Sequence, residues 1–207
     1  MRHSNNYITK TTVIIVILLV GSITSNAQQY FKASYIDAEA TGSFKGWDLS
    51  GFELTTGDKT YFESGKSFWD LGMGLSWREE SVSGSASYDN LSFSGSVSTD
   101  SLALTLYPQL GYDVTNWMSL YAGPHFGVNW NLLSVSGSVT VDGTTYSGSA
   151  IADDFGYNYG YGAGVTFTLS ENLGIDLGWR SDTRPDFLET SVDYESEYWH
   201  FGLYLEF

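Results

Sequence analysis

The chain has 207 residues and no cysteine, so it has neither a disulfide framework nor the cysteine that anchors a lipoprotein. It has only 3 prolines, and 9 lysine and arginine residues stand against 24 aspartate and glutamate residues. Because so acidic a surface repels phosphate groups, the composition argues against nucleic acid as a partner. No apolar run approaches the roughly 20 residues that a membrane-spanning helix needs. If a membrane holds this chain, strands must anchor it.

The first 27 residues have the three-part pattern of a cleaved secretory signal peptide. A basic start leads into a short apolar run from Val13 to Val20, and Ala27 lies at a small-residue cleavage site. We predict a signal peptide at residues 1–27 and a single mature domain at residues 28–207. Cleavage removes two basic residues and no acidic one, which leaves 7 against 24 and a net charge of −17.

The last nine residues, Trp199–Phe207, alternate strictly between apolar side chains and small or polar ones. Nine residues is about the length that a tilted strand needs to cross a bilayer. A terminal phenylalanine with apolar residues at every second position before it resembles the signal by which the barrel-assembly machinery recognises outer-membrane barrels. The predicted insertion signal consists of Phe201, Leu203, Leu205 and Phe207.

The same alternation recurs through much of the mature chain. From Trp69 to Trp77 every second residue is apolar, and the residues between them are small or charged. An apolar outside with a small or polar inside is the reverse of a water-soluble sheet and is typical of a transmembrane barrel. Residues 47–62 keep no clean period, and we infer a strand there from the need for an even number. The other predicted strands are 29–38, 68–77, 102–112, 120–132, 157–169, 173–180 and 199–207.

The connections between these strands are alternately short and long. Residues 113–116 and 170–172 form short turns, whereas about 79–100, 134–154 and 181–193 form long loops. This asymmetry matches short periplasmic turns and long extracellular loops, and it gathers an outer aromatic girdle at Trp77, Trp130, Tyr157, Trp179 and Trp199. The sequence therefore predicts an all-β, eight-stranded antiparallel transmembrane barrel, surrounded by the lipids of a bacterial outer membrane. The alternative is a soluble β-sandwich, which would hide the aromatic faces between two sheets.

One hairpin carries a resemblance to a known family. Within Ser101–Leu133 the chain reads Leu-Tyr-Pro-Gln-Leu-Gly-Tyr, then a short turn with asparagine, then Leu-Tyr-Ala-Gly-Pro-His-Phe-Gly. This run resembles the central hairpin of the porin-family outer-membrane β-barrel domain, especially its Bacteroidetes-type members. The resemblance implies an eight-stranded, OmpA-like barrel. The family has no shared catalytic residues, and no cofactor is implied.

Several charged side chains point into the predicted barrel. An eight-stranded barrel is only wide enough for side chains to fill it, so these charges need partners. One interpretation is an ion-pair network that plugs the lumen and satisfies charges that are costly to bury. The alternative is a charge-lined channel for small solutes. The predicted lumen charges are Lys32, Asp70, Arg78, Asp176, Arg180 and Glu206.

A lipid-modifying enzyme is a second alternative. His125 and His200 also point inward, but neither lies in a metal-binding or nucleophile motif, so we predict neither a metal site nor catalysis. Pro108 and Pro124 lie on adjoining strands, and each removes a hydrogen-bond donor from the wall. Folding the hairpin about Thr115 places Pro108 opposite Ala122 and Pro124 opposite Leu106, so the two lost bonds lie close together. These could form a lateral gap for an acyl chain or a simple bend.

Acidic residues gather near the predicted outer rim, especially in the connection 181–193. Their spacing matches no calcium-loop signature. We regard divalent-cation binding at this rim as a hypothesis and solvated acidic loops as the alternative. The residues concerned are Asp153, Asp154, Asp182, Asp186, Glu189, Asp193, Glu195 and Glu197.

Two of the long connections are copies of one another at a shift of 53 residues. Ser81–Ser85 is identical to Ser134–Ser138, and Ser94–Ser96 is identical to Ser147–Ser149. The second copy contains Asp142-Gly143, a strong signal for a two-residue hairpin turn. We predict that both connections are ribbons that continue past the outer girdle and offer strand edges to surface partners. Flexible loops that shield the barrel mouth are the alternative.

Overall fold

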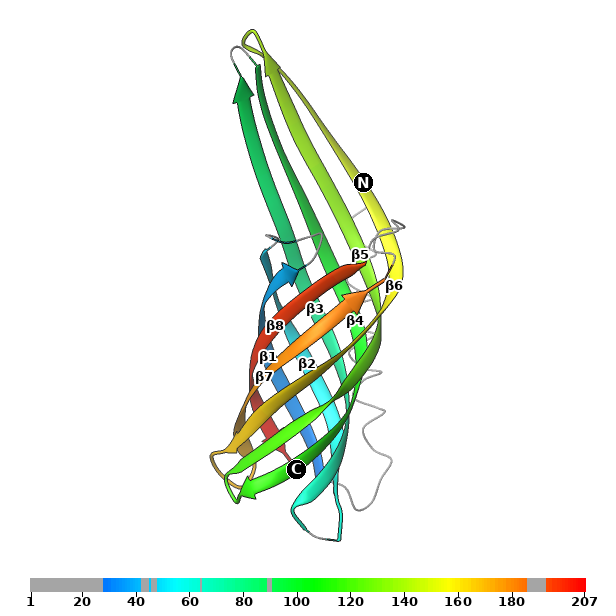
Figure 1. Ribbon diagram of the computed structural model, residues 1–207, viewed down its shortest axis with the longest axis vertical. Coiled ribbons are helices and arrows are strands. Elements are labelled where there is room, and N and C mark those ends of the chain that lie inside the picture. The colour runs from blue at the N-terminus through cyan, green and yellow to red at the C-terminus, as the bar shows by residue number, and fades with distance from the viewer. Residues whose placement is uncertain (1–27, 42–44, 46–47, 64, 89–90, 186–192) are drawn as a thin grey trace, which may run out of the picture.

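The computed structural model describes residues 28–207 except 42–44, 46–47, 64, 89–90 and 186–192, so the predicted signal peptide lies outside the described residues. Each strand pairs antiparallel with the next, and β1 pairs with β8 to close the barrel (Figure 1). The predicted eight-stranded antiparallel barrel is confirmed, and the soluble sandwich is excluded because one sheet closes on itself. The strands are β1 (Gln28–Thr41), β2 (Asp48–Tyr61), β3 (Ser67–Tyr88), β4 (Leu91–Thr115), β5 (Met118–Val141), β6 (Thr144–Thr168), β7 (Leu173–Arg184) and β8 (Tyr194–Glu206).

Alternation along each strand decides which side chains face outward. On β3, Trp77 is 53% exposed while the next residue, Arg78, is 2% exposed. Successive side chains of a strand point to opposite faces, so the apolar set covers the outside and the polar set fills the lumen. In the part of the chain that the structure describes, no helix has the length and apolarity needed to cross a membrane.

The strand inferred at residues 47–62 is present as β2, despite its irregular pattern. It pairs with β1 and β3, with Phe52 opposite both Tyr35 and Trp77 on the outer face. Gly57 lies so close to Gly72 and the Tyr30 hydroxyl that a Cβ there would be 2.7 to 2.8 Å from both. The glycines that obscure the period are therefore places where neighbouring groups approach closely.

Short connections join the strands at one end of the barrel, here called the turn end. The connection between β6 and β7 matches the predicted turn at 170–172. The turn predicted at 113–116 is wrong in position, because β4 continues to Thr115 and only Asn116 and Trp117 separate it from β5. Asp113 pairs with Ser119, whose hydroxyl donates a 2.6 Å hydrogen bond to the Asp113 carboxylate, and this contact keeps the strands paired closer to the turn.

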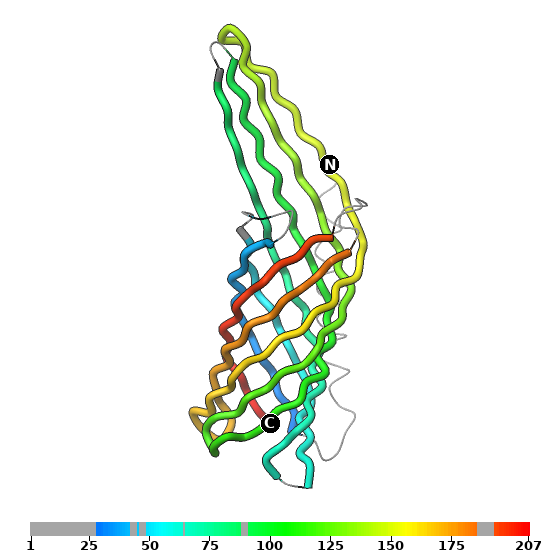
Figure 2. Tube along the Cα trace, in the orientation of Figure 1, coloured from blue at the N-terminus to red at the C-terminus, as the bar shows by residue number. Residues whose placement is uncertain are grey.

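Strands β3 to β6 run far beyond the other four and form a single-layer sheet (Figures 1 and 2). We call this sheet, residues 82–88, 91–97, 135–141 and 144–150, the blade. The predicted ribbons are confirmed as strands, but their separation is wrong, because β4 and β5 also pair from Leu91–Val141 down to Leu106–Phe126. The second hairpin turns at Asp142 and Gly143, whose φ angles of 48° and 79° are typical of a tight hairpin turn. The tip of the first hairpin lies outside the described residues.

Candidate functional site: a filled lumen and an extended blade

Strand β7 supplies more of the buried charges in the lumen than any other described strand. Asp176, Arg180, Asp182 and Arg184 are each 2% exposed or less, and each occupies an even position along the strand. Their even spacing directs all four inward, where they meet side chains of β1, β2 and β3 from across the barrel. These contacts form successive layers of paired charges between the turn end and the blade.

The middle layer is a pair between Arg180 and Glu53. The Arg180 guanidinium donates hydrogen bonds of 3.0 and 2.9 Å to the two Glu53 carboxylate oxygens. The Tyr107 hydroxyl donates a further hydrogen bond to Glu53, and the guanidinium carbon lies 4.1 Å from the centre of the Tyr107 ring. Both charged groups are buried, so hydrogen bonding and stacking must offset the cost of taking them out of water.

The next layer toward the turn end is centred on Asp176. Lys32 Nζ lies 3.0 Å from Asp176 Oδ2, and His200 Nε2 lies 2.8 Å from the same oxygen. The Tyr121 hydroxyl donates to Asp176 at 3.0 Å. Three polar partners on three different strands therefore converge on one buried carboxylate.

Two further contacts complete the lumen near the turn end. The Tyr30 hydroxyl donates a 2.9 Å hydrogen bond to Asp70. Lys59 Nζ lies 3.9 Å from Glu206 Oε1 and also over the ring of Phe68, 4.8 Å from its centre. This end of the lumen is therefore held by phenols and aromatic rings as much as by ion pairs.

The layers nearest the blade are centred on Asp182 and Arg184. Arg78 Nη1 lies 3.0 Å from Asp182 Oδ2, and His125 Nε2 lies 3.1 Å from Asp182 Oδ1. Arg184 Nη1 in turn lies 3.0 Å from Glu80 Oε1. Burial, and then the charge of Glu80, raise the pKa of the Tyr194 hydroxyl, which lies beyond the aromatic girdle. These side chains join β3, β5 and β7 across the upper lumen.

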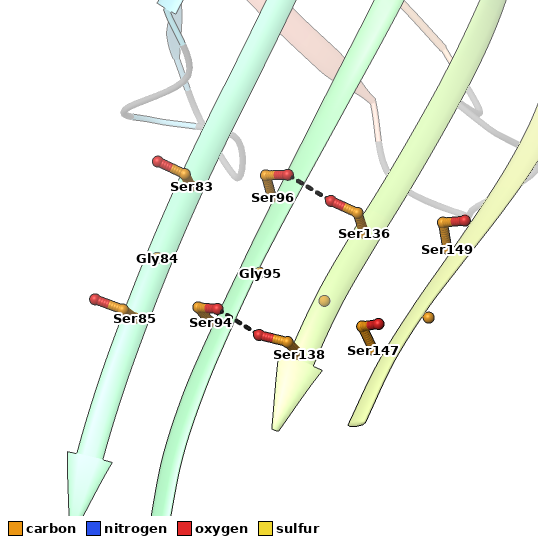
Figure 3. Close-up of a pocket in the computed structure, with 12 residues that line it drawn as sticks. Ser83, Gly84, Ser85, Ser94, Gly95, Ser96, Ser136, Ser138, Ser147 and Ser149 are labelled. Atoms are coloured by element: carbon orange, nitrogen blue, oxygen red, sulfur yellow. Dashed lines mark hydrogen bonds between the residues drawn. The ribbon is translucent and has the colours of Figure 1, made fainter. Parts of the chain in front are cut away.

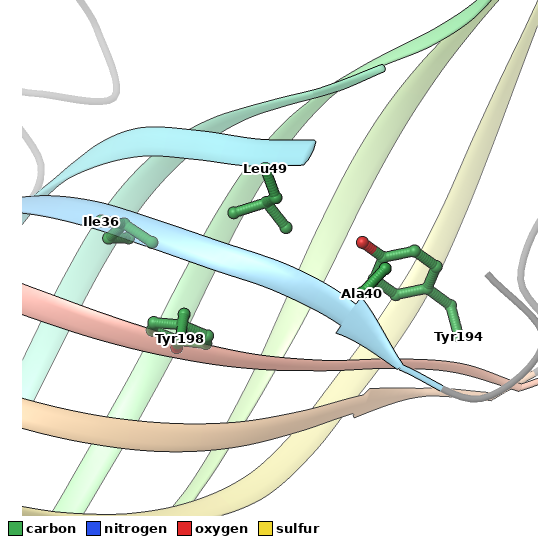
Figure 4. Close-up of a cluster of buried hydrophobic side chains, with 5 residues drawn as sticks. All are labelled: Ile36, Ala40, Leu49, Tyr194 and Tyr198. Atoms are coloured by element: carbon green, nitrogen blue, oxygen red, sulfur yellow. The ribbon is translucent and has the colours of Figure 1, made fainter. Parts of the chain in front are cut away.

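A cluster of buried apolar side chains lies on β1, β2 and β8 (Figure 4). Ile36 and Ala40 of β1, Leu49 of β2, and Tyr194 and Tyr198 of β8 are each 2% exposed or less. They come from the three neighbouring strands that end where the blade continues. The Tyr198 ring lies 5.4 Å from the Arg78 guanidinium carbon and the Tyr194 ring 5.0 Å from that of Arg184, so the cluster packs beside the charged layers.

Little free space remains between these layers. The described side chains of the lumen leave a cavity of about 20 Å³ near Lys32, Asp70 and Asp176, which is room for about one water molecule. Inward glycines make the filling possible, because a Cβ at Gly160 would lie 2.8 Å from the His125 imidazole and one at Gly164 would meet Tyr121. Small residues on one strand thus accept large side chains from another.

All six predicted lumen charges point inward. The layers also contain charged residues that the sequence analysis did not assign to the lumen. Glu53 and Lys59 were missed because β2 lacks a clean period. Glu80, Asp182 and Arg184 were assigned to loops, although they continue the even spacing of β3 and β7. The assignment of Asp182 to an acidic outer rim is wrong, because its carboxylate is buried against Arg78.

The two prolines occupy different positions from those predicted. Leu106 pairs with Phe126 and Leu110 pairs with Ala122, so Pro108 and Pro124 face one another between these pairs. The predicted pairing was wrong by two residues because the turn lies beyond Thr115. At Gly123 a Cβ would collide with the Pro108 backbone and lie 2.8 Å from Gln109 Cα. The strands stay in close contact here, which argues against a lateral gap.

The predicted girdle residues lie on the outer face. Trp77, Leu102, Trp130 and Phe155 stand side by side in register across β3 to β6, and Trp179 lies opposite Trp199 on β7 and β8. Tyr157 is 57% exposed. Alternation also places the predicted insertion signal, namely Phe201, Leu203, Leu205 and Phe207, on the exposed side of the closing strand.

Among the described residues, no group of three or more histidine, aspartate or glutamate side chains could hold a metal ion. His125 and His200 each contact a carboxylate of the ion-pair layers. Asp186 and Glu189 of the acidic rim hypothesis lie outside the described residues.

No protein-family model matches the sequence, and no curated protein matches it. Among solved structures, the chain is similar to Ail, the attachment invasion locus protein of Yersinia pestis, in complex with the heparin analogue sucrose octasulfate. That match has a TM-score of 0.51 at 14% identity and covers 88% of this chain and 100% of that chain. Neisserial surface protein A gives 0.41 at 14% identity, with 86% and 97% covered. OprG from Pseudomonas aeruginosa gives 0.39 at 10% identity, with 89% and 98% covered.

The closed ring of eight strands, with apolar side chains outside and paired charges inside, is the fold of a transmembrane β-barrel. The similarity to Ail supports this fold and, at 14% identity, nothing narrower. The predicted eight-stranded antiparallel barrel is confirmed, whereas the finer resemblance to OmpA-like barrels stays a prediction. Membership of the porin family, and of its Bacteroidetes-type branch, stays a prediction.

Proposed function

We propose that this chain is an integral outer-membrane protein in which a sealed barrel holds a blade for contacts at the cell surface. The observation that carries the proposal is the blade itself. Four strands continue as a single-layer sheet, and no described strand pairs with the outer edge of Val82–Tyr88 on β3 or of Thr144–Ala150 on β6. Exposed strand edges bind partners by adding a strand to the sheet.

The pattern of connections supports the orientation of this proposal. Short connections at the turn end suit the periplasm, and the blade then projects outward from the cell. The predicted signal peptide at 1–27 would direct export, and the outward-facing residues from Phe201 to Phe207 would present the insertion signal to the barrel-assembly machinery. Outer-membrane lipids would contact the apolar wall between the turn end and the outer aromatic girdle.

The filled lumen favours a barrel that anchors the blade in the membrane over a barrel that conducts small solutes. We expect the purified protein in planar bilayers to give no large, stable conductance steps at neutral pH, because paired charges fill the lumen and the cavity near Asp176 holds about one water molecule. As a control, the double variant Glu53→Ala/Arg180→Ala removes the middle layer and should conduct measurably more. Large stable steps from the unaltered protein would contradict the sealed barrel and favour the small-solute channel.

The positions of the charged side chains also indicate which kind of surface partner the protein would bind. Lys32, Lys59, Arg78, Arg180 and Arg184 are all buried in the lumen, whereas exposed acids such as Asp100 and Asp153 lie near or beyond the girdle. The sulfated ligand of Ail is therefore a poor model for this chain, because an acidic surface repels a polyanion. A lipid-modifying activity has little support, because the strands at Pro108 remain in contact.

A shortened blade tests the surface role. Replacing residues 82–97 and 135–150 with Asn-Gly turns keeps the pairs Ser81–Ser98 and Ser134–Ile151 and should leave the barrel intact. We expect cells displaying this variant to adhere about tenfold less to epithelial monolayers or to polystyrene than cells displaying the full chain. Retention of the barrel is checked by heat-modifiable electrophoretic mobility, and Lys66→Ala at the turn end is the matched control. Equal adherence on both surfaces would reject the surface role.

A further inference from the structure

The blade consists of four copies of one short motif held in register (Figure 3). A serine-glycine-serine sequence occurs on each strand, and Gly84, Gly95, Gly137 and Gly148 pair in a single row across the sheet. The eight flanking serines lie on the opposite face, on the side that continues the outside of the barrel. The same hairpin therefore occurs twice: β3 and β4 form the first copy, and β5 and β6 form the second at a shift of 53 residues.

This repeat makes the contact between β4 and β5 a template for a contact between two molecules. Because β6 is the copy of β4 and β5 is the copy of β3, the same surfaces that meet at β4–β5 are exposed again at the edges of β6 and β3. We propose that the β6 edge of one blade pairs antiparallel with the β3 edge of a second copy of this chain in the same membrane.

The side chains at the two edges fit this pairing. Within one molecule, Ser94 and Ser138 hydroxyls lie 2.9 Å apart, and Ser96 and Ser136 hydroxyls lie 2.8 Å apart. The shift of 53 residues maps these contacts onto Ser147 with the second copy's Ser85, and onto Ser149 with its Ser83. On the opposite face of the sheet, Phe93 pairs with Val139 within one molecule. The shift of 53 residues maps this pair onto Tyr146 and the second copy's Ala86, so a larger residue again meets a smaller one.

Charge also favours a second copy as the occupant. The four blade segments contain no charged residue and no proline, although the mature chain has a predicted net charge of −17. Edge strands that avoid pairing generally have lysine, proline or a bulge, and none of these is present in Val82–Tyr88 or Thr144–Ala150. Two strongly acidic molecules can therefore approach along their blades without placing like charges opposite each other.

The spacing suits molecules that stand side by side. Four strands about 4.8 Å apart and tilted by about 40° occupy about 25 Å of the membrane plane. Eight such strands close into a barrel about 16 Å across between Cα atoms, or about 25 Å with its outward side chains. The repeat distance of the paired blades thus equals the width of the barrels beneath them. Because β6 of one copy meets β3 of the next, the contact is head-to-tail and generates rows or rings.

Disulfide trapping tests this contact. Because the chain has no native cysteine, only the introduced cysteines can form disulfides. In the double variant Ser85→Cys/Ser147→Cys, the two residues are three strand spacings apart within a molecule, about 14 Å, too far for an internal disulfide, which requires Cα atoms within about 7 Å. We expect oxidation in sparse lipid vesicles to give a ladder of dimers, trimers and larger species. Each single variant alone should remain monomeric, and a mixture of the two should give dimers. Adding Val82→Lys at the β3 edge should reduce the ladder about tenfold.

The control pair is Ser94→Cys/Ser138→Cys, which should close within one molecule. A monomeric Ser85→Cys/Ser147→Cys variant, beside a control pair that closes, would overturn the proposed pairing. The pairing would also be overturned if each single variant alone gave dimers in the same yield as the double variant. That result would indicate contacts between identical edges, such as those between apposed cells. The inference rests on the proposed function for the shared orientation in one membrane. Failure of the control pair would instead reject the blade on which that function depends.

Discussion

Replacing Arg180 with alanine is expected to reduce the free energy of unfolding by about 3 to 5 kcal/mol. The substitution leaves the Glu53 carboxylate buried and without the guanidinium that contacts both of its oxygens. It also removes the cation that stacks on Tyr107. An uncompensated buried charge of this kind is one of the few causes of so large an effect from a single residue. Urea unfolding in lipid vesicles, followed by tryptophan fluorescence, measures the loss.

A double variant separates the cost of the orphaned charge from the value of the pair. Glu53→Leu/Arg180→Met fills the layer with apolar side chains of similar size, and we expect it to recover most of the lost stability. Lys66→Ala, which removes an exposed charge at the turn end, should change the free energy by less than about 0.5 kcal/mol. If Arg180→Ala changed the free energy of unfolding as little as Lys66→Ala, water would have to reach the middle layer, and the barrel would not be sealed there.

A charge placed on the outer wall should be nearly as costly, but only at membrane depth. Leu106 lies on the outer face of β4 between the two ends of the barrel and is 47% exposed. We expect Leu106→Arg to cost about 2 to 4 kcal/mol, because arginine at the bilayer midplane loses its hydration. That cost corresponds to a decrease of roughly 30-fold to 1000-fold in the folding equilibrium constant.

The matched control lies on the same strand and the same face. Ser96 is an exposed blade residue of β4, and Ser96→Arg should change the free energy of folding into vesicles by less than about 0.5 kcal/mol. Comparing the two variants in bilayers shows whether lipid surrounds the wall and ends below the blade. Equal costs at both positions would contradict the placement of the membrane between the turn end and the outer aromatic girdle.

Local periodicity was sufficient to predict which side chains face lipid and which face the lumen. The alternation from Trp69 to Trp77 and from Trp199 to Phe207 holds in the structure because a strand can direct successive side chains only to opposite faces. The hairpin at Asp142-Gly143 was equally predictable, because few other dipeptides adopt two positive φ angles so readily. Where glycines interrupt the alternation, as in β2, periodicity did not predict the strand, which was inferred from the need for an even number, and Glu53 was missed.

The polar inside and the repeated hairpins were predictable because they depend on residues that are close together in the chain, and the count of eight strands followed from the need for an even number. The pairing of Arg180 with Glu53, and the position of Asp182 in the lumen beside Arg78, became evident only in the folded barrel. Closure of the barrel sets which distant strands face each other across the lumen, and no local period contains that information. The same holds for the blade, which becomes one sheet because β4 and β5 are neighbours in the closed ring and remain paired beyond it.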